Sequence, residues 1–352
     1  MERSLIADFS QRVGPDDGMT EFFKCPVNNC YAREPVVVKM ANGTLVCVFL
    51  AGGPTEPHNK NVVLIKRSYD DGKTWTDTEV LFSHRHVGLW PTELYMGGEK
   101  PMLVVSMYNA DCPFKMLQTF VSYTEDNGET WSKPTMADPA MCTTSIRRGF
   151  KMSNGETLVA LYYVMARDGF QWDVDNFYKP GWWDGQFSEC AVAVSSDDGK
   201  TFTRYGRIWQ DGASLWEPNC IELEPGHIVM LIRHDRTGVM GRCDSYDYGR
   251  TWGEYHLTDI PNAGSKITAF TVNGKACVIG NFNGKARNHL QMRISSDGLK
   301  SWEKIISLDD DEKMFTYPHV HVDEQNQMLY IAYENYVQHY LLKISFEEAG
   351  LI

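Results

Sequence analysis

The chain has 352 residues, with 34 Lys and Arg against 46 Asp and Glu, so its formal net charge is −12, and 43% of its residues are hydrophobic. This acidic balance argues against nucleic acid or an anionic membrane as a partner, because binding to either relies on a positive surface. No apolar run approaches the roughly 18 residues of a membrane helix.

Nine cysteines are spread along the chain, and only Cys25 and Cys30 lie close together. This spacing is not a metal-ligand pattern, so most cysteines are expected to be reduced and buried. Residues 1–9 lack the basic start and apolar core of a secretion signal. We therefore expect a cytoplasmic protein, or a secreted or periplasmic one if a signal peptide has been removed. No linker divides the chain, which predicts a single domain over 1–352.

A short phrase recurs five times, with Ser or Thr first, Asp third and an aromatic residue eighth. The copies span 68–75, 124–131, 195–202, 245–252 and 295–302. The fifth position is Gly in four copies and Leu299 in the last. The Asp can accept hydrogen bonds from its own turn, Gly supplies positive φ, and the aromatic ring can pack between neighbouring sheets. Each copy, called a box below, therefore predicts a tight turn in a repeated β-unit.

The fifth positions of successive boxes are separated by 56, 71, 50 and 50 residues. A four-stranded antiparallel blade with its loops takes about 40 to 50 residues, so the spacing predicts propeller blades. The longer step is assigned to an aromatic insertion over 169–185. A strand-rich segment follows the last box. We therefore predict an all-β fold, a six-bladed β-propeller whose last blade is completed by an N-terminal strand.

Two segments before the first box carry candidate functional residues. Arg33-Glu34-Pro35 opens an apolar, strand-like run, and the Pro/Gly loop over 51–61 contains Glu56 and His58 but no Asp. Glu and His can titrate near neutral pH when their surroundings shift them, so both are candidate proton donors. Solvated loop residues are the alternative interpretation.

Aromatic residues between the first and third boxes are candidates for sugar binding, because sugar rings stack on flat aromatic faces. Trp90 follows a His84-Arg85-His86 loop, and Trp182 lies in the insertion. A hydrophobic cover over the third blade explains Trp182 equally well. Arg147 and Arg148, near the start of the third blade, could line a central pocket, but exposed loop charge is the expected explanation.

The remaining candidates follow the third box. Glu217 precedes a proline, Arg233 lies 16 residues later, Arg287 precedes the fifth box, and Tyr317 follows it. A strand-end arginine can simply pair with a surface carboxylate, Glu217 can cap a turn, and Tyr317 can be a half-buried edge aromatic. Arginines from separate blades that meet at one point favour an acidic ligand, because guanidinium groups bind carboxylates through paired hydrogen bonds.

Through the five boxes and the order of these segments, nearly the whole chain resembles the sialidase (neuraminidase) superfamily. The resemblance implies that Arg33, Arg233 and Arg287 form a triad for a substrate carboxylate. It implies Tyr317 as the nucleophile, Glu217 as its general base, retained anomeric configuration, and no metal or organic cofactor. The family keeps an acid/base aspartate in the loop that corresponds to 51–61, and this chain does not match it.

The leading hypothesis is thus a sialidase-like exo-glycoside hydrolase whose partner is a carbohydrate with a terminal acidic sugar. One alternative is a polysaccharide lyase or another glycosidase on the same propeller, with His58 or Glu56 handling the proton. The other alternative is a non-catalytic propeller that binds carbohydrate or scaffolds proteins.

Overall fold

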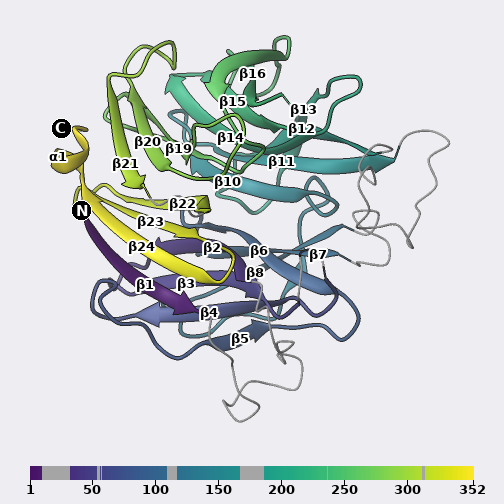
Figure 1. Ribbon diagram of the computed structural model, residues 1–352. Helices are drawn as coiled ribbons and strands as arrows, with labels where there is room; N and C mark the ends of the chain where they lie inside the picture. Colours follow the sequence, from purple (N-terminus) through teal and green to yellow (C-terminus); the bar gives the residue numbers. More distant parts are fainter. Residues whose placement is uncertain are drawn as a thin grey trace.

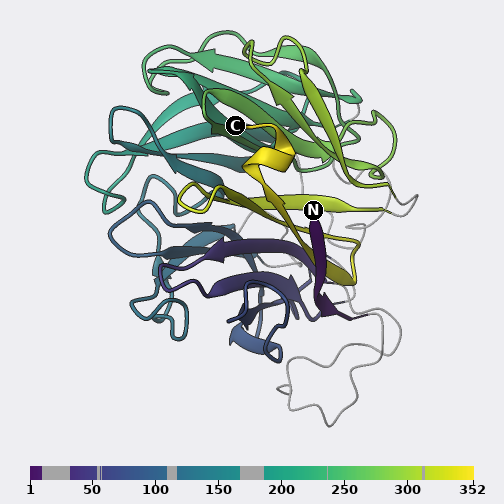
Figure 2. The same ribbon diagram turned by 90° about the vertical axis from the view of Figure 1, so that its left-hand side faces the viewer.

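The computed structural model describes residues 1–9, 32–53, 56, 58–108, 117–166, 186–235, 237–310 and 314–352. Within these residues, 24 strands form six antiparallel four-stranded sheets, the blades of a ring (Figure 1, Figure 2). The first strand of each described sheet contacts that of the next, and β22 contacts β2, which closes the ring. The predicted six-bladed propeller is confirmed. No helix in the described ranges is both long and apolar enough to cross a membrane.

Each blade runs from an inner strand at the axis to an outer strand at the rim. Blade 1 consists of β2 (Ala32–Lys39), β3 (Leu45–Ala51), β4 (Val62–Ser68) and β5 (Glu79–Phe82). Blade 2 consists of β6 (Gly88–Tyr95), β7 (Met102–Tyr108), β8 (Gln118–Tyr123) and β9 (Thr135–Met136). Blade 3 consists of β10 (Ser145–Lys151), β11 (Thr157–Ala166), β12 (Gln186–Ser195) and β13 (Thr203–Ile208).

Blades 4 to 6 repeat this order, and the chain ends in a short helix. Blade 4 consists of β14 (Leu215–Glu224), β15 (His227–His234), β16 (Val239–Ser245) and β17 (His256–Pro261). Blade 5 consists of β18 (Thr268–Val272), β19 (Lys275–Asn281), β20 (Leu290–Ser295) and β21 (Lys304–Asp309). Blade 6 consists of β22 (Thr316–Asp323), β23 (Met328–Glu334), β24 (Gln338–Ser345) and β1 (Glu2–Asp8), and α1 (Phe346–Ala349) follows β24.

The first strand of the chain completes the last blade, as predicted. β1 pairs antiparallel with β24, so that Glu2 lies opposite Lys343 and Asp8 lies opposite Gln338. Figures 1 and 2 show this purple strand beside the yellow one. Ile6 of β1 is buried in an apolar cluster with residues of blades 1 and 6. Pairing of the first strand with the last therefore covers the edge of β24 and gives blade 6 its fourth strand.

The five boxes form the same turn. In the first, the Ser68 hydroxyl donates to Asp70 and accepts from the Gly72 amide, both at 2.8 Å. Asp70 also accepts from the amide (2.9 Å) and the hydroxyl (2.6 Å) of Thr74. The same four contacts recur in the other copies. Leu299, at the fifth position of the last box, adopts φ 71°, so that copy keeps the turn without glycine there.

Acid is expected to weaken these turns. Hydrogen bonds from Thr74 and Thr130 hold the pKa of Asp70 and of Asp126 at about 2, below the ordinary 3.8. A lowered folded-state pKa stabilises the fold above the unfolded value, and this contribution is lost as the pH falls. We expect the melting temperature, followed by circular dichroism, to fall between about pH 4 and pH 2. A D70N/D126N variant should depend less on pH in that window, and an unchanged dependence would contradict the assignment.

The apolar core lies between neighbouring blades, and the closing aromatic residue of each box packs there. Val63 of β4 and Leu103 of β7 belong to one buried cluster between blades 1 and 2, and Trp131 of the second box packs against it. The other closing residues pack in the same way at their own junctions, namely Trp75, Phe202, Trp252 and Trp302. Each box thus ties its blade to the preceding one, as the sequence predicted.

Candidate active site

Three inner strands share one local distortion near their beginning. Glu34 in β2, Glu217 in β14 and Tyr317 in β22 each precede a proline and adopt positive φ, at 54°, 46° and 54°. The pairing register with the next strand shifts at each of these positions, which identifies a β-bulge. A bulge redirects a side chain and tolerates proline, and bulges are frequent beside active sites. The shared bulge therefore places the carboxylates of Glu34 and Glu217 and the phenol of Tyr317 at equivalent positions on three blades.

The three arginines predicted from sequence surround the ring of Tyr317. The Arg33 guanidinium carbon lies 4.0 Å and that of Arg287 lies 5.8 Å from the centroid of the Tyr317 ring. Nη1 of Arg233 donates a hydrogen bond to the Tyr317 hydroxyl at 3.1 Å. Burial and the charge of Glu217 raise the pKa of Tyr317 despite these arginines. The phenol is therefore protonated at neutral pH and needs a base before it can act as a nucleophile.

Glu217 is held as a carboxylate next to that phenol. It accepts hydrogen bonds from Nη1 of Arg233 at 2.9 Å and from Nη2 of Arg147 at 3.3 Å. Burial alone would raise the pKa of Glu217, but these two arginines outweigh it and lower the pKa to about 2. The same Nη1 of Arg233 thus donates to both Glu217 and the Tyr317 hydroxyl. The structure brings the predicted base and nucleophile together around one guanidinium group.

Arg33 is positioned by aromatic and acidic neighbours. Its guanidinium lies over the rings of Tyr317 (4.0 Å) and Tyr336 (4.4 Å), and its Nε donates to Glu334 at 2.8 Å. Glu334 is fully buried and also accepts a hydrogen bond from the backbone amide of Tyr336. Burial raises the pKa of Glu334, and Arg33 opposes this shift. Arg33 is therefore fixed in place before any ligand binds.

The two candidate proton donors occupy different surroundings. A carboxylate oxygen of Glu56 lies 3.7 Å from Nη1 of Arg33, and 19% of the Glu56 side chain is exposed. Burial and the charge of Glu34 raise the pKa of Glu56 to about 8, although Arg33 lies nearby. Glu56 is therefore mostly protonated at pH 7 and can donate a proton. The described hydrogen bonds of His58 go to other residues: its Nδ1 accepts from the Lys60 amide at 3.1 Å, and its backbone amide donates to the Tyr108 hydroxyl at 2.9 Å.

Arg147 belongs to the site, although the sequence favoured exposed loop charge. Only 2% of Arg147 is exposed. Its Nη1 donates to Glu34 at 2.6 Å and its Nη2 to Glu217 at 3.3 Å, so one guanidinium joins two of the bulge residues. The expectation for Arg147 was wrong because the inner strand of blade 3 faces the axis. The residue-before-proline pattern shared with Glu217 and Tyr317 was the signal that could have identified Glu34.

Lys266 was also missed, and it adds a further cation. Its Nζ lies 3.9 Å from Glu34 and 5.3 Å from the centroid of the Tyr317 ring, and 4% of the residue is exposed. Burial lowers the pKa of Lys266, and Glu34 opposes this shift. Lys266 lies two residues before the start of β18 and has no distinctive motif around it. The described site therefore holds five cationic side chains, from Arg33, Arg147, Arg233, Lys266 and Arg287.

A cavity opens beside two of the triad arginines. Its volume is about 490 Å³, and its lining includes Arg233, Asp235, Asn262, Gly264 and Arg287. Nη2 of Arg287 donates to the Gly264 carbonyl at 2.5 Å, while Nε of Arg233 donates to Asp235 at 2.9 Å. Cavities of several hundred Å³ accommodate small ligands. The cavity thus offers room for a sugar residue next to fixed guanidinium groups.

Of the two tryptophans predicted to contact substrate, Trp90 is not brought to this cluster. Trp90 is 3% exposed, packs against Tyr108 with ring centroids 4.5 Å apart, and belongs to an apolar cluster with Leu50 and Leu117. No described contact joins Trp90 to the arginines. Trp182 lies outside the described residues.

His319 and His321 do not form a metal site in the described part of the chain. The Val37 amide donates to Nδ1 of His319 at 3.2 Å, so Nε2 carries the proton and donates to Glu93 at 3.0 Å. Among the described residues, no three metal-binding side chains gather. His319 therefore has a structural role, joining blades 1, 2 and 6.

Comparisons with known proteins agree with this fold. A family model described as "BNR repeat-like domain" matches residues 113–331. A protein named Sialidase from Bacteroides fragilis (strain YCH46) is 23% identical, with 78% of this chain and 54% of that protein covered. The chain thus spans about half the length of this relative.

Solved structures show the same architecture. The Hadza microbial sialidase Hz136 has a TM-score of 0.70 at 19% identity, covering 90% of this chain and 66% of that one. A protein of unknown function from Dyadobacter fermentans DSM 18053 has a TM-score of 0.71 at 16% identity, covering 97% and 98%. Together with the boxes and the six blades, the family match shows that this chain belongs to the BNR repeat-like domain family and is a propeller of the sialidase superfamily.

Proposed function

We propose that the protein is a sialidase-like exo-glycoside hydrolase that removes a terminal acidic sugar and retains the anomeric configuration. The observation that carries the proposal is the gathering of Arg33, Arg233 and Arg287 around Tyr317. Such a cluster suits a carboxylate, because planar guanidinium groups form paired, charge-assisted hydrogen bonds with it. The similarity to proteins named sialidase supports the same reaction class.

The substrate carboxylate would bind between these guanidinium groups. Arg33 and Arg233 already contact Glu334 and Glu217, whereas the described hydrogen bond of Arg287 goes to a carbonyl oxygen. The charge of Arg287 is thus the most available for a ligand. Its position beside the 490 Å³ cavity would place the acidic group of the sugar there.

The first chemical step would form a tyrosyl-sugar intermediate. The Tyr317 oxygen attacks the anomeric carbon, its proton passes to Glu217, and the glycosidic C–O bond breaks. Glu56 gives its proton to the departing oxygen. A neutral nucleophile avoids setting a further carboxylate against the negative charge of the substrate.

The second step would reverse these roles. Glu56, now a carboxylate, removes a proton from water, and the water oxygen attacks the anomeric carbon. The bond to Tyr317 breaks, and Tyr317 recovers its proton from Glu217. Two displacements at one carbon give overall retention. In this scheme Glu56 takes the role that the superfamily assigns to an aspartate.

A substrate screen tests the reaction class. We expect turnover of an aryl sialoside or an aryl uronide, but not of neutral aryl glycosides, and NMR of the fresh product should show the anomer of the substrate. An unsaturated product that absorbs in the ultraviolet would identify a lyase instead. Binding of glycans without turnover across the panel would leave only a binding propeller.

Replacing Arg287 by Met should weaken carboxylate recognition without leaving a buried acid unpaired. Charge-assisted hydrogen bonds contribute about 1.5–3 kcal/mol, so we expect KM to rise by about 10- to 100-fold with a smaller change in kcat. Arg293→Met is the matched control, because Arg293 lies in the same blade with its guanidinium 4.1 Å from the Phe282 ring centroid. Equal effects of the two substitutions would contradict carboxylate binding by Arg287.

A further inference from the structure

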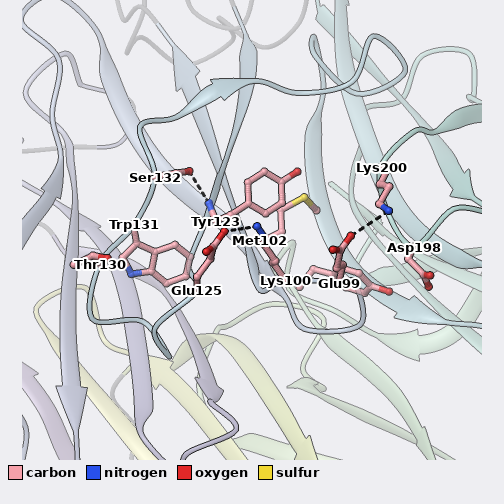
Figure 3. A pocket seen from close by; sticks show the side chains of 13 residues that line it. Glu99, Lys100, Met102, Tyr123, Glu125, Thr130, Trp131, Ser132, Asp198 and Lys200 are labelled. Carbon is pink, nitrogen blue, oxygen red and sulfur yellow. Dashed lines mark hydrogen bonds and ion pairs between the residues drawn. The ribbon is translucent and has the colours of Figure 1, made fainter.

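A second cavity lies at the other end of the propeller from the arginine cluster. It has a volume of about 630 Å³ and lies between blades 2 and 3 (Figure 3). Its walls come from the β6–β7 connection and from the second and third boxes. Arg33, Glu217 and Tyr317 lie near the start of inner strands, whereas the β6–β7 connection follows the end of one. In an antiparallel sheet the first and third strands run in the same direction, so the box turns, which follow the third strands, lie at the same end of the blades as the β6–β7 connection. The cavity is therefore remote from the candidate active site.

The wall and floor of this cavity are aromatic and rigid. Trp131 is half-buried, and its indole Nε1 donates to the Gly128 carbonyl at 3.2 Å, which fixes the ring. Tyr123 is half-buried beside it, and Figure 3 shows both rings on the side of the cavity next to Glu125. Tyr95 and Met102, each 4% exposed, belong to the floor. Fixed aromatic faces of this kind suit the apolar face of a sugar ring, because little conformational freedom is lost on binding.

The rim carries both donors and acceptors. Lys100 pairs with Glu125, and Lys200 pairs with Glu99 at 3.1 Å on the opposite side (Figure 3). The exposed fractions of these four side chains range from 45% to 74%. Asp198 also lines the cavity and pairs with Lys151 at 3.0 Å. The charges of the three ion pairs balance, so neither an anion nor a cation would be favoured. A neutral ligand with many hydroxyl groups could use the ammonium groups as donors and the carboxylates as acceptors.

Part of the cavity volume is explained by the residue at the eighth position of the third box. The eighth residue is Trp in four boxes but Phe202 here. Phe202 belongs to the apolar cluster that also contains Tyr95 and Met102 of the cavity floor. In the second and fourth boxes the indole Nε1 donates to the box glycine carbonyl, at 3.2 and 2.9 Å. The equivalent glycine, Gly199, lines the cavity, so an indole at position 202 would extend toward it.

We propose that this cavity is a binding site for a neutral saccharide, separate from the catalytic centre. The size, the fixed aromatic faces and the balanced polar rim all suit a pyranose disaccharide. The site would hold the protein on a glycan while the opposite end of the ring acts on terminal residues. This binding does not depend on the reaction proposed above.

Saturation-transfer NMR with N-acetyllactosamine and cellobiose tests the proposal, because neither sugar carries a carboxylate for the arginine cluster. We expect millimolar binding of at least one probe to the full chain. Phe202→Trp, which restores the residue of the other boxes, should weaken it at least about fivefold. The exposed K100A/K200A double variant should also weaken it and provides a second test if Phe202→Trp does not fold.

The active-site variant Arg287→Met is the matched control and should leave binding of both probes unchanged. Phe202→Trp should in turn leave turnover at the catalytic centre unchanged. Absence of binding by both probes at 20 mM, or equal binding by the wild type and K100A/K200A, would overturn the proposal. Loss of binding in Arg287→Met alone would assign the saccharide to the arginine cluster instead.

Discussion

Tyr317→Phe is expected to lower kcat/KM for an aryl sialoside by about 10³-fold or more, which corresponds to about 4 kcal/mol of transition-state stabilisation. The substitution removes the oxygen that would form the covalent intermediate but keeps the ring against the Arg33 guanidinium, 4.0 Å away. Because the arginines stay in place, KM should change much less than kcat. Steady-state kinetics measures the changes in kcat and KM. Mass spectrometry of the wild type with a fluorinated sialoside, which traps the covalent intermediate, should show the adduct on Tyr317, and the variant should show none.

Tyr330→Phe is the matched control for the loss of a tyrosine hydroxyl. The Tyr330 hydroxyl contacts Lys39 and Asp71, each at 2.7 Å, outside the arginine cluster. We expect near-normal turnover from this variant even if its melting temperature falls. A Tyr317→Phe enzyme that retains more than a tenth of wild-type activity would show that Tyr317 is not the nucleophile.

Glu56→Gln should remove the alkaline limb of the pH–rate profile. The pKa of Glu56 is raised to about 8 by burial and by the charge of Glu34. The protonated form is the acid, so activity should be present below about pH 8 and should be lost as the pH rises through that value. Glutamine cannot donate this proton, and general acid catalysis typically contributes about 10²- to 10⁴-fold. We expect a loss in this range on a substrate with a poor leaving group.

Two comparisons separate the role of Glu56 from a loss of structure. A nitrophenyl leaving group needs little protonation, so Glu56→Gln should be impaired far less on that substrate than on an alkyl glycoside. His58→Ala should retain most activity on both, because the described hydrogen bonds of His58 join it to Lys60 and Tyr108 and not to the arginines. If His58→Ala instead removes the alkaline limb, His58 is the donor and the assignment of Glu56 is wrong.

The fold could be predicted from the sequence because each box determines its own turn. The contacts of Asp70 reach only from Ser68 to Thr74, so a seven-residue window contains all of them. The number of blades then followed from the spacing of the five boxes together with the strand-rich segment after the last box. The closing strand β1 was predictable for a different reason, since without it blade 6 would have three strands and the edge of β24 would be unpaired.

The site could be predicted only in part, because its contacts join distant segments. Arg147 meets Glu34 and Glu217 across 113 and 70 residues, so no local pattern connects them. For Trp90 the error was the reverse of that for Arg147: the residue was predicted to contact substrate and is buried in the core. An aromatic residue on an inner strand can face the pocket or the apolar layer, and the ring packs against Tyr108 in the core. Residue type alone does not decide which.

The bulge shared by Glu34, Glu217 and Tyr317 also bears on how such enzymes diversify. Three blades present the same backbone shape while carrying an acid, an acid and a phenol. The backbone shape therefore does not depend on whether the side chain is a carboxylate or a phenol. We therefore expect related propellers to differ in their chemistry at these three equivalent positions while the strands that hold them keep their shape.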